Sequence, residues 1–81
     1  MNIIKVYGSG CANCKRLEVM CTEIIKENNF DAAIEKVTDL QTIMKTGILS
    51  TPGLEINGKM ISSGKLPTKS TLVYWIQDNI Q

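Results

Sequence analysis

Hydrophobic and polar residues recur along the chain with periods that separate strands from helices. Residues 3–7 are rich in β-branched and aromatic side chains, which indicates a strand, and residues 30–37, after the break at Asn28-Asn29, are predicted to form a second strand. Between them, residues 12–28 repeat apolar positions at the three- and four-residue spacing of a helix with one buried face. The buried face of this helix is predicted to consist of Cys14, Leu17, Cys21, Ile24 and Ile25.

Two further helices are predicted in the second half of the chain. Thr38 is followed three residues later by Gln41, which fits a capping box at the start of a short helix that ends at Gly47. Thr68 is expected to cap a last helix. The apolar side of that helix is formed by Leu72, Val73, Ile76 and Ile80.

A hairpin lies between these two helices. Asn57-Gly58 separates two short alternating segments, residues 53–56 and 59–62, and predicts a tight turn. The element order is therefore βαβαββα. Its first two strands should be parallel, with a right-handed crossover through the helix. We expect an α/β fold, a four-stranded mixed sheet with helices on both faces, forming one domain over residues 1–81.

Composition argues against several classes of function. Nine Lys and Arg residues oppose eight Asp and Glu residues, and a net charge of +1 is not typical of a nucleic-acid-binding protein. No apolar segment approaches the roughly 20 residues that span a bilayer. A strand that begins beside Asn2 leaves no room for a signal peptide, so a cytoplasmic protein without membrane contact is expected. The absence of histidine excludes Ser-His-Asp and Cys-His catalysis.

The candidate chemistry lies in Cys11-Ala12-Asn13-Cys14, where the first strand leads into the first helix. Cys11 would lie near unpaired backbone N–H groups and the positive end of the helix dipole, which both stabilise a thiolate. The three-residue spacing places Cys14 one turn later, facing inward. We therefore expect Cys11 to attack a substrate disulfide and Cys14 to resolve the mixed disulfide.

A Cys-x-x-Cys pair has other interpretations. Soft-metal chaperones of the ferredoxin-like class carry such a pair between the first strand and first helix, and thiolates suit Cu(I) or Zn. Their βαββαβ order ends in a strand, however, whereas this chain ends in a helix. A non-catalytic interaction domain is a third possibility. Cys21 is expected to be a buried, inert thiol, with a redox or ligand role as the alternative.

Three segments together resemble the thioredoxin superfamily: Gly8-Ser9-Gly10-Cys11-Ala12-Asn13-Cys14-Lys15, Thr51-Pro52 before a strand, and Gly64-Lys65-Leu66-Pro67. Within it, the chain is most similar over its whole length to small, glutaredoxin-sized redox-active-disulfide proteins of archaea and bacteria. The resemblance implies an enzyme, a thiol–disulfide oxidoreductase acting on protein disulfides. It also implies that the cysteine pair works without a metal or another cofactor. By analogy, the electron donor would be a flavoprotein similar to thioredoxin reductase.

The same resemblance implies roles for Thr51 and Pro52. Pro52 would follow a cis peptide bond and pack beside the cysteine pair. The backbone of Thr51 would pair with an extended substrate segment opposite Cys11, as a short β-augmentation.

The active-site loop departs from the usual Trp-Cys-Gly-Pro-Cys pattern of thioredoxins. Gly10 replaces the tryptophan, and Ala12-Asn13 replaces Gly-Pro. Lys5 stands six residues before Cys11, where thioredoxins carry a buried acid. A cation cannot be the same proton acceptor, and we expect Lys5 to point outward as a solvated strand residue.

Overall fold

The computed structural model describes residues 2–48 and 50–80, and its elements follow the predicted order. The strands are β1 (Asn2–Tyr7), β2 (Ala32–Val37), β3 (Gly53–Ile56) and β4 (Lys59–Ser63). The helices are α1 (Ala12–Asn28), α2 (Leu40–Lys45) and α3 (Lys69–Asn79). No helix among the described residues is both long and apolar enough to cross a membrane.

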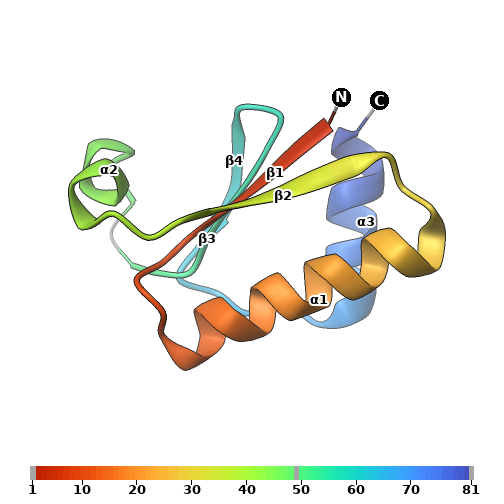
Figure 1. The fold of residues 1–81 in the computed structure, drawn as a ribbon, viewed down its shortest axis with the longest axis horizontal. Coiled ribbons are helices and arrows are strands. Elements are labelled where there is room, and N and C mark those ends of the chain that lie inside the picture. Colours follow the sequence, from red (N-terminus) through yellow and green to blue (C-terminus); the bar gives the residue numbers. More distant parts are fainter. Residues whose placement is uncertain (1, 49, 81) are drawn as a thin grey trace.

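The four strands form one mixed sheet in the order β2-β1-β3-β4. β1 runs parallel to β2 and antiparallel to β3, and β4 runs antiparallel to β3. β1 is therefore a central strand, and the connection from β1 to β2 passes through α1 (Figure 1). The predicted α/β fold with a four-stranded mixed sheet is confirmed.

The core lies between one face of the sheet and the two long helices. Figure 1 shows α1 and α3 on the same side of the sheet. Alternate residues of the central strands point toward these helices and are fully buried or nearly so. The buried cluster comprises Ile4, Val6, Leu54 and Ile56 from the strands and Leu17, Cys21, Ile24, Leu72 and Ile76 from the helices. Burial of this apolar surface is the main favourable contribution to folding.

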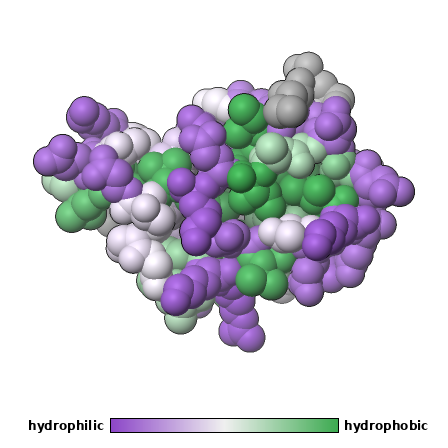
Figure 2. All heavy atoms as spheres, viewed as in Figure 1, coloured by the Kyte–Doolittle hydropathy of each residue, from purple (hydrophilic) through white to green (hydrophobic). Residues whose placement is uncertain are grey.

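The opposite face of the sheet is covered only in part. The six-residue α2 lies apart from α1 and α3, beside the end of the sheet where β2 ends (Figure 1). Ile48, which follows α2, reaches the second face next to Gly53 and Tyr7. Farther along β1, Ile3 is 38% exposed. Figure 2 also shows hydrophobic residues gathered over the middle of the molecule, along the edge strand β2.

Several predicted boundaries differ from the structure by one or two residues, among them the start of α2 and the start of β2. The N-cap of α2 is Asp39, not Thr38, because the Asp39 carboxylate accepts hydrogen bonds from the backbone N and the Oγ1 of Thr42. β2 begins at Ala32, because Ala32 N donates to the carbonyl of Phe30 in a turn that holds Phe30 outside the strand. The predicted cap of α3, Thr68, is confirmed by its side chain, which accepts from Thr71 N.

The hairpin turn also fastens the sheet to the last helix. Asn57 and Gly58 both have positive φ angles, 52° and 85°, as a two-residue type I′ turn requires. Asn57 Nδ2 donates to Asn2 Oδ1 at 2.9 Å and to the Asn79 carbonyl at 3.0 Å. Asn57 Oδ1 accepts from the backbone N of Ile3 at 2.9 Å. One side chain therefore links β1, the hairpin and α3.

Candidate active site

Cys11 and Cys14 are joined by a disulfide at the start of α1, with their Cα atoms 5.1 Å apart. Cys11 is the N-cap of α1, and its Sγ accepts a hydrogen bond from the backbone N of Cys14 at 3.1 Å. The sulfur therefore occupies the place that a Ser or Asp oxygen takes at other helix starts. This donor, together with the helix dipole, favours negative charge on Cys11 once the disulfide is reduced.

The two sulfurs differ in their access to solvent. Cys11 is exposed, whereas Cys14 is only 5% exposed. Ala12 and Asn13, between them, are also exposed, and Gly10 before them has a φ of +92° that favours glycine. An incoming disulfide therefore reaches Cys11 before it reaches Cys14.

Gly8 packs directly against the inner cysteine. A Cβ atom built on Gly8 would overlap Cys14 Sγ and would lie 2.9 Å from Cys14 Cβ. The backbone at this point is anchored, since Gly8 N donates to the Val37 carbonyl at 3.0 Å. The close approach of the end of β1 to α1 thus requires a residue without a side chain.

Thr51 and Pro52 are about forty residues from the cysteines in the sequence. A Cβ atom built on Gly8 would overlap Cys14 Sγ and lie 3.8 Å from Thr51 Cβ, so Cys14 and Thr51 both lie close to Gly8. The Thr51–Pro52 peptide bond is cis, Pro52 is fully buried, and Thr51 is half-buried. The Pro52 carbonyl accepts from Gly64 N at 2.8 Å, which ties this loop to the segment after β4.

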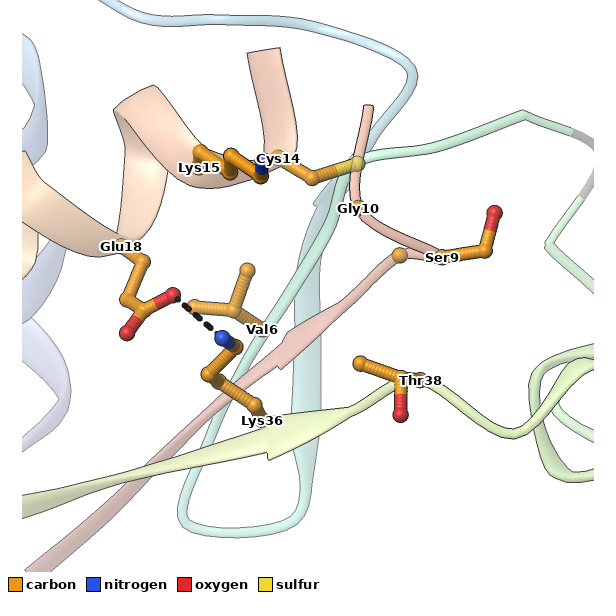
Figure 3. Close-up of a pocket in the computed structure, with 9 residues that line it drawn as sticks. Val6, Ser9, Gly10, Cys14, Lys15, Glu18, Lys36 and Thr38 are labelled. Carbon is orange, nitrogen blue, oxygen red and sulfur yellow. Dashed lines mark ion pairs between the residues drawn. The ribbon is translucent and has the colours of Figure 1, made fainter. Parts of the chain in front are cut away.

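A cavity of about 90 Å³ lies behind Cys14, on the β2 side of the disulfide. Glu18 and Lys36 line it and form an ion pair, with Oε2 and Nζ 3.3 Å apart (Figure 3). The other lining residues are Val6, Gly8, Ser9, Gly10, Cys14, Lys15 and Thr38. Neither Glu18 nor Lys36 was among the candidate residues predicted from the sequence. A signal existed for Glu18, which follows Cys14 by four residues on one helix face.

Lys5 points away from the disulfide. Its Nζ lies 3.9 Å from Glu55 Oε2, on the face of the sheet opposite Val6, and its side chain is 35% exposed. Glu55 also accepts a hydrogen bond from Tyr7 Oη at 2.9 Å. Burial, and then this hydrogen bond, raise the pKa of Tyr7 to about 12. Val6 rather than Lys5 therefore faces the cavity behind Cys14.

Cys21 is a free thiol, fully buried within the core cluster, as the helical pattern predicted. Burial raises the pKa of Cys21 to about 12, with a smaller contribution from the charge of Glu18. Because the thiolate is the reactive form of cysteine, this protonated thiol is unreactive at neutral pH. Across residues 2–48 and 50–80, no three His, Cys, Asp or Glu side chains converge as a metal site would require.

A reachable sulfur at a helix start, with a buried partner one turn behind, is suited to exchange with other disulfides. On this fold, the cysteine pair defines a thiol–disulfide oxidoreductase of the thioredoxin class. The sequence matches the thioredoxin domain family over residues 2–77, and the chain belongs to that family.

Relatives from two archaea support this assignment. A thioredoxin of Methanothermobacter thermautotrophicus is 36% identical over 69 residues, which cover 85% of this chain and 90% of the relative. A thioredoxin of Methanocaldococcus jannaschii is 31% identical over 68 residues, covering 84% of this chain and 78% of the relative. The fold is also similar to that of the germline-specific thioredoxin Deadhead of Drosophila melanogaster. That comparison gives a TM-score of 0.68 at 13% identity, covering 98% of this chain and 81% of the other.

Proposed function

We propose that this chain reduces disulfides in protein substrates by passing them two electrons from the Cys11–Cys14 dithiol. The observation that carries the proposal is the unequal placement of the two sulfurs. Cys11 is exposed and accepts a backbone hydrogen bond at the start of α1, whereas Cys14 is buried behind it. Exchange through this pair requires no metal and no other cofactor.

In the first step, the Cys11 thiolate attacks one sulfur of the substrate disulfide. A bond forms between Cys11 Sγ and that sulfur, the substrate S–S bond breaks, and the departing thiolate takes up a proton from solvent. The backbone N–H of Cys14 and the dipole of α1 stabilise the attacking Cys11 thiolate. The product is a mixed disulfide between chain and substrate.

In the second step, Cys14 loses its proton and attacks Cys11 Sγ. The Cys11–Cys14 bond forms, the mixed disulfide breaks, and the second substrate sulfur leaves as a thiolate that is then protonated. The substrate has gained two electrons and two protons, and the chain is left as the disulfide seen here. The three-residue spacing within one turn of α1 keeps Cys14 within reach for this step.

Two further parts of the proposal concern binding. Thr51 is half-buried beside the disulfide, which supports a role for its backbone in pairing with an extended substrate segment. Membership of the thioredoxin family supports regeneration by a reductase, and we propose a flavoprotein of the thioredoxin-reductase kind. Such a partner would return two electrons to the Cys11–Cys14 disulfide.

Cysteine variants test the proposal and separate the two roles. With a peptide disulfide as substrate, Cys11→Ser and Cys14→Ser should each lose turnover by at least about 100-fold, because each lacks one sulfur of the exchange. Cys14→Ser should still accumulate a Cys11–peptide adduct, seen as a mass increase that dithiothreitol removes. Cys11→Ser should form no such adduct.

Cys21→Ser is the matched control, since it removes a thiol that the mechanism does not use. It should keep turnover and form no adduct of its own. Turnover by Cys11→Ser would contradict the proposal. Absence of exchange in the unmodified protein, combined with stoichiometric Cu(I) binding that requires both cysteines, would favour the soft-metal alternative instead.

A further inference from the structure

The chain's net charge of +1 is unevenly distributed over the fold. We call residues 8–18, 36–48, 50–52 and 63–67 the disulfide end. They comprise the cysteine loop with the start of α1, the end of β2 with α2, and the loops around Pro52. This end carries a net charge of +3 from five cations and two acids: Lys15, Arg16, Lys36, Lys45 and Lys65 against Glu18 and Asp39. The other described residues carry a net charge of −2.

The cations of the disulfide end come from several elements. Lys15 and Lys36 line the cavity behind Cys14, from α1 and β2 (Figure 3). Lys65 follows Gly64, whose N–H binds the Pro52 carbonyl. Lys45 is in the last turn of α2, at the same end of the molecule as the start of α1 (Figure 1). Figure 2 shows both hydrophilic and hydrophobic residues at this end, where Leu40 and Met44 of α2 are exposed.

Most of this positive charge has no ion-pair partner within the described part of the chain. Lys36 pairs with Glu18, but Lys15, Arg16, Lys45 and Lys65 are exposed and form no salt bridge there. Elsewhere, Lys5 pairs with Glu55 and Lys69 pairs with Glu27, whereas Lys26 and Lys59 form no salt bridge among the described residues. Four of these six cations without a salt bridge therefore belong to the disulfide end.

We propose that the disulfide end selects disulfides carried on acidic polypeptide segments. The inference rests on the proposed function and adds a substrate class to it. Clustered charges of one sign steer oppositely charged partners and disfavour partners of like charge. The Debye length is roughly 8–10 Å at 0.1–0.15 M salt, so attraction between these exposed cations and acidic residues that flank a substrate disulfide should weaken as salt is added.

The test uses three peptide disulfides that are identical except for residues flanking the disulfide: Glu, Gln or Lys. At low ionic strength, kcat/KM should be about 10-fold or more higher for the Glu peptide than for the Lys peptide. The Gln peptide should fall between them. In 0.5 M NaCl the three values should converge, because the Debye length shortens to a few ångströms.

Charge-reversal variants locate the effect on the surface. Lys45→Glu with Lys65→Glu should reduce the ratio of kcat/KM for the Glu peptide to kcat/KM for the Lys peptide several-fold, with the Gln peptide measured as the uncharged reference. The matched control, Lys26→Glu with Lys59→Glu, changes the net charge equally but lies outside the disulfide end, and should keep most of the preference.

The outcomes separate this inference from the proposed function. Exchange with the Gln peptide but no preference for Glu over Lys would overturn the inference and leave the proposed function intact. An equal loss of preference in both pairs of variants would overturn it as well, since net charge alone would then explain the effect. No exchange with any of the three peptides would contradict the proposed function itself.

Discussion

Gly8→Ala tests the contact that holds the inner cysteine in place. The added Cβ would overlap Cys14 Sγ and lie 2.9 Å from Cys14 Cβ, whereas ordinary carbon–carbon contacts are about 3.5–4.0 Å. The end of β1 and the start of α1 must therefore separate by at least roughly half an ångström. Both are constrained, by the Gly8 N–Val37 carbonyl hydrogen bond and by the burial of Cys14.

Overpacking of this kind costs about 1–3 kcal/mol of unfolding free energy. For a domain of this size, a loss of about 2 kcal/mol lowers the melting temperature by roughly 8–16 °C. The cost should depend on the redox state. In the disulfide, Cys14 Sγ is held by its bond to Cys11, whereas the free thiol can turn to another rotamer. The contact with Cys14 Cβ remains in both states. The reduced form should therefore lose some unfolding free energy, but less than the oxidised form.

Urea unfolding of the oxidised and the reduced protein measures both losses. Gly58→Ala is the control, because Gly58 has a φ of +85° and no heavy atom within 4 Å of an added Cβ. It should cost about 1 kcal/mol from backbone strain, equally in both redox states. An oxidised Gly8→Ala protein within about 0.5 kcal/mol of the unmodified protein would refute the close contact. Equal losses in the two redox states would refute its link to the sulfur.

Two further predictions concern Cys21 and Thr51. Because burial raises the pKa of Cys21 from 9.0 to about 12, the stability it contributes is present below its unfolded pKa and is lost as pH rises toward 12. In a Cys11→Ser/Cys14→Ser background, Cys21 should contribute a loss of about 1 kcal/mol of unfolding free energy between pH 9 and 10. Cys21→Val should remove that part of the slope and leave the smaller part due to Tyr7, whose pKa is also raised; an unchanged slope would contradict the assignment. If the Thr51 backbone pairs with substrate, N-methylation of the peptide amide beside the substrate disulfide should lower kcat/KM about 5- to 10-fold, the value of one hydrogen bond, whereas methylation four residues away should not. Equal effects at the two positions would argue against pairing.

The element order was predictable because each element carries its own local signal. Apolar residues at helical spacing identified the buried face of α1, and Asn57-Gly58 identified the hairpin. The cap of α2 was misplaced because Thr38 and Asp39 are both good capping residues, and only the three-dimensional course of the chain decides between them. Local pattern therefore predicts elements better than their boundaries.

From residue spacing alone, the site was predictable only where it is local. Cys11 and Cys14 are neighbours on one turn, so their spacing was enough to suggest the pair. The Glu18–Lys36 ion pair depends on how β2 packs beneath α1, which no local pattern records. The positive charge of the disulfide end could not be recognised from composition for a related reason. Composition averages the whole chain to +1, whereas folding collects cations from three separate segments.

The Asn57 hydrogen bonds have a practical consequence for handling the molecule. They gather Asn2 and Asn79 at the end of the fold remote from the cysteines, and Figure 1 shows both chain ends marked there. A linker, dye or solid support attached at either end would leave Cys11 Sγ exposed to solvent. Immobilised or fused forms should thus keep their reactivity toward large partners.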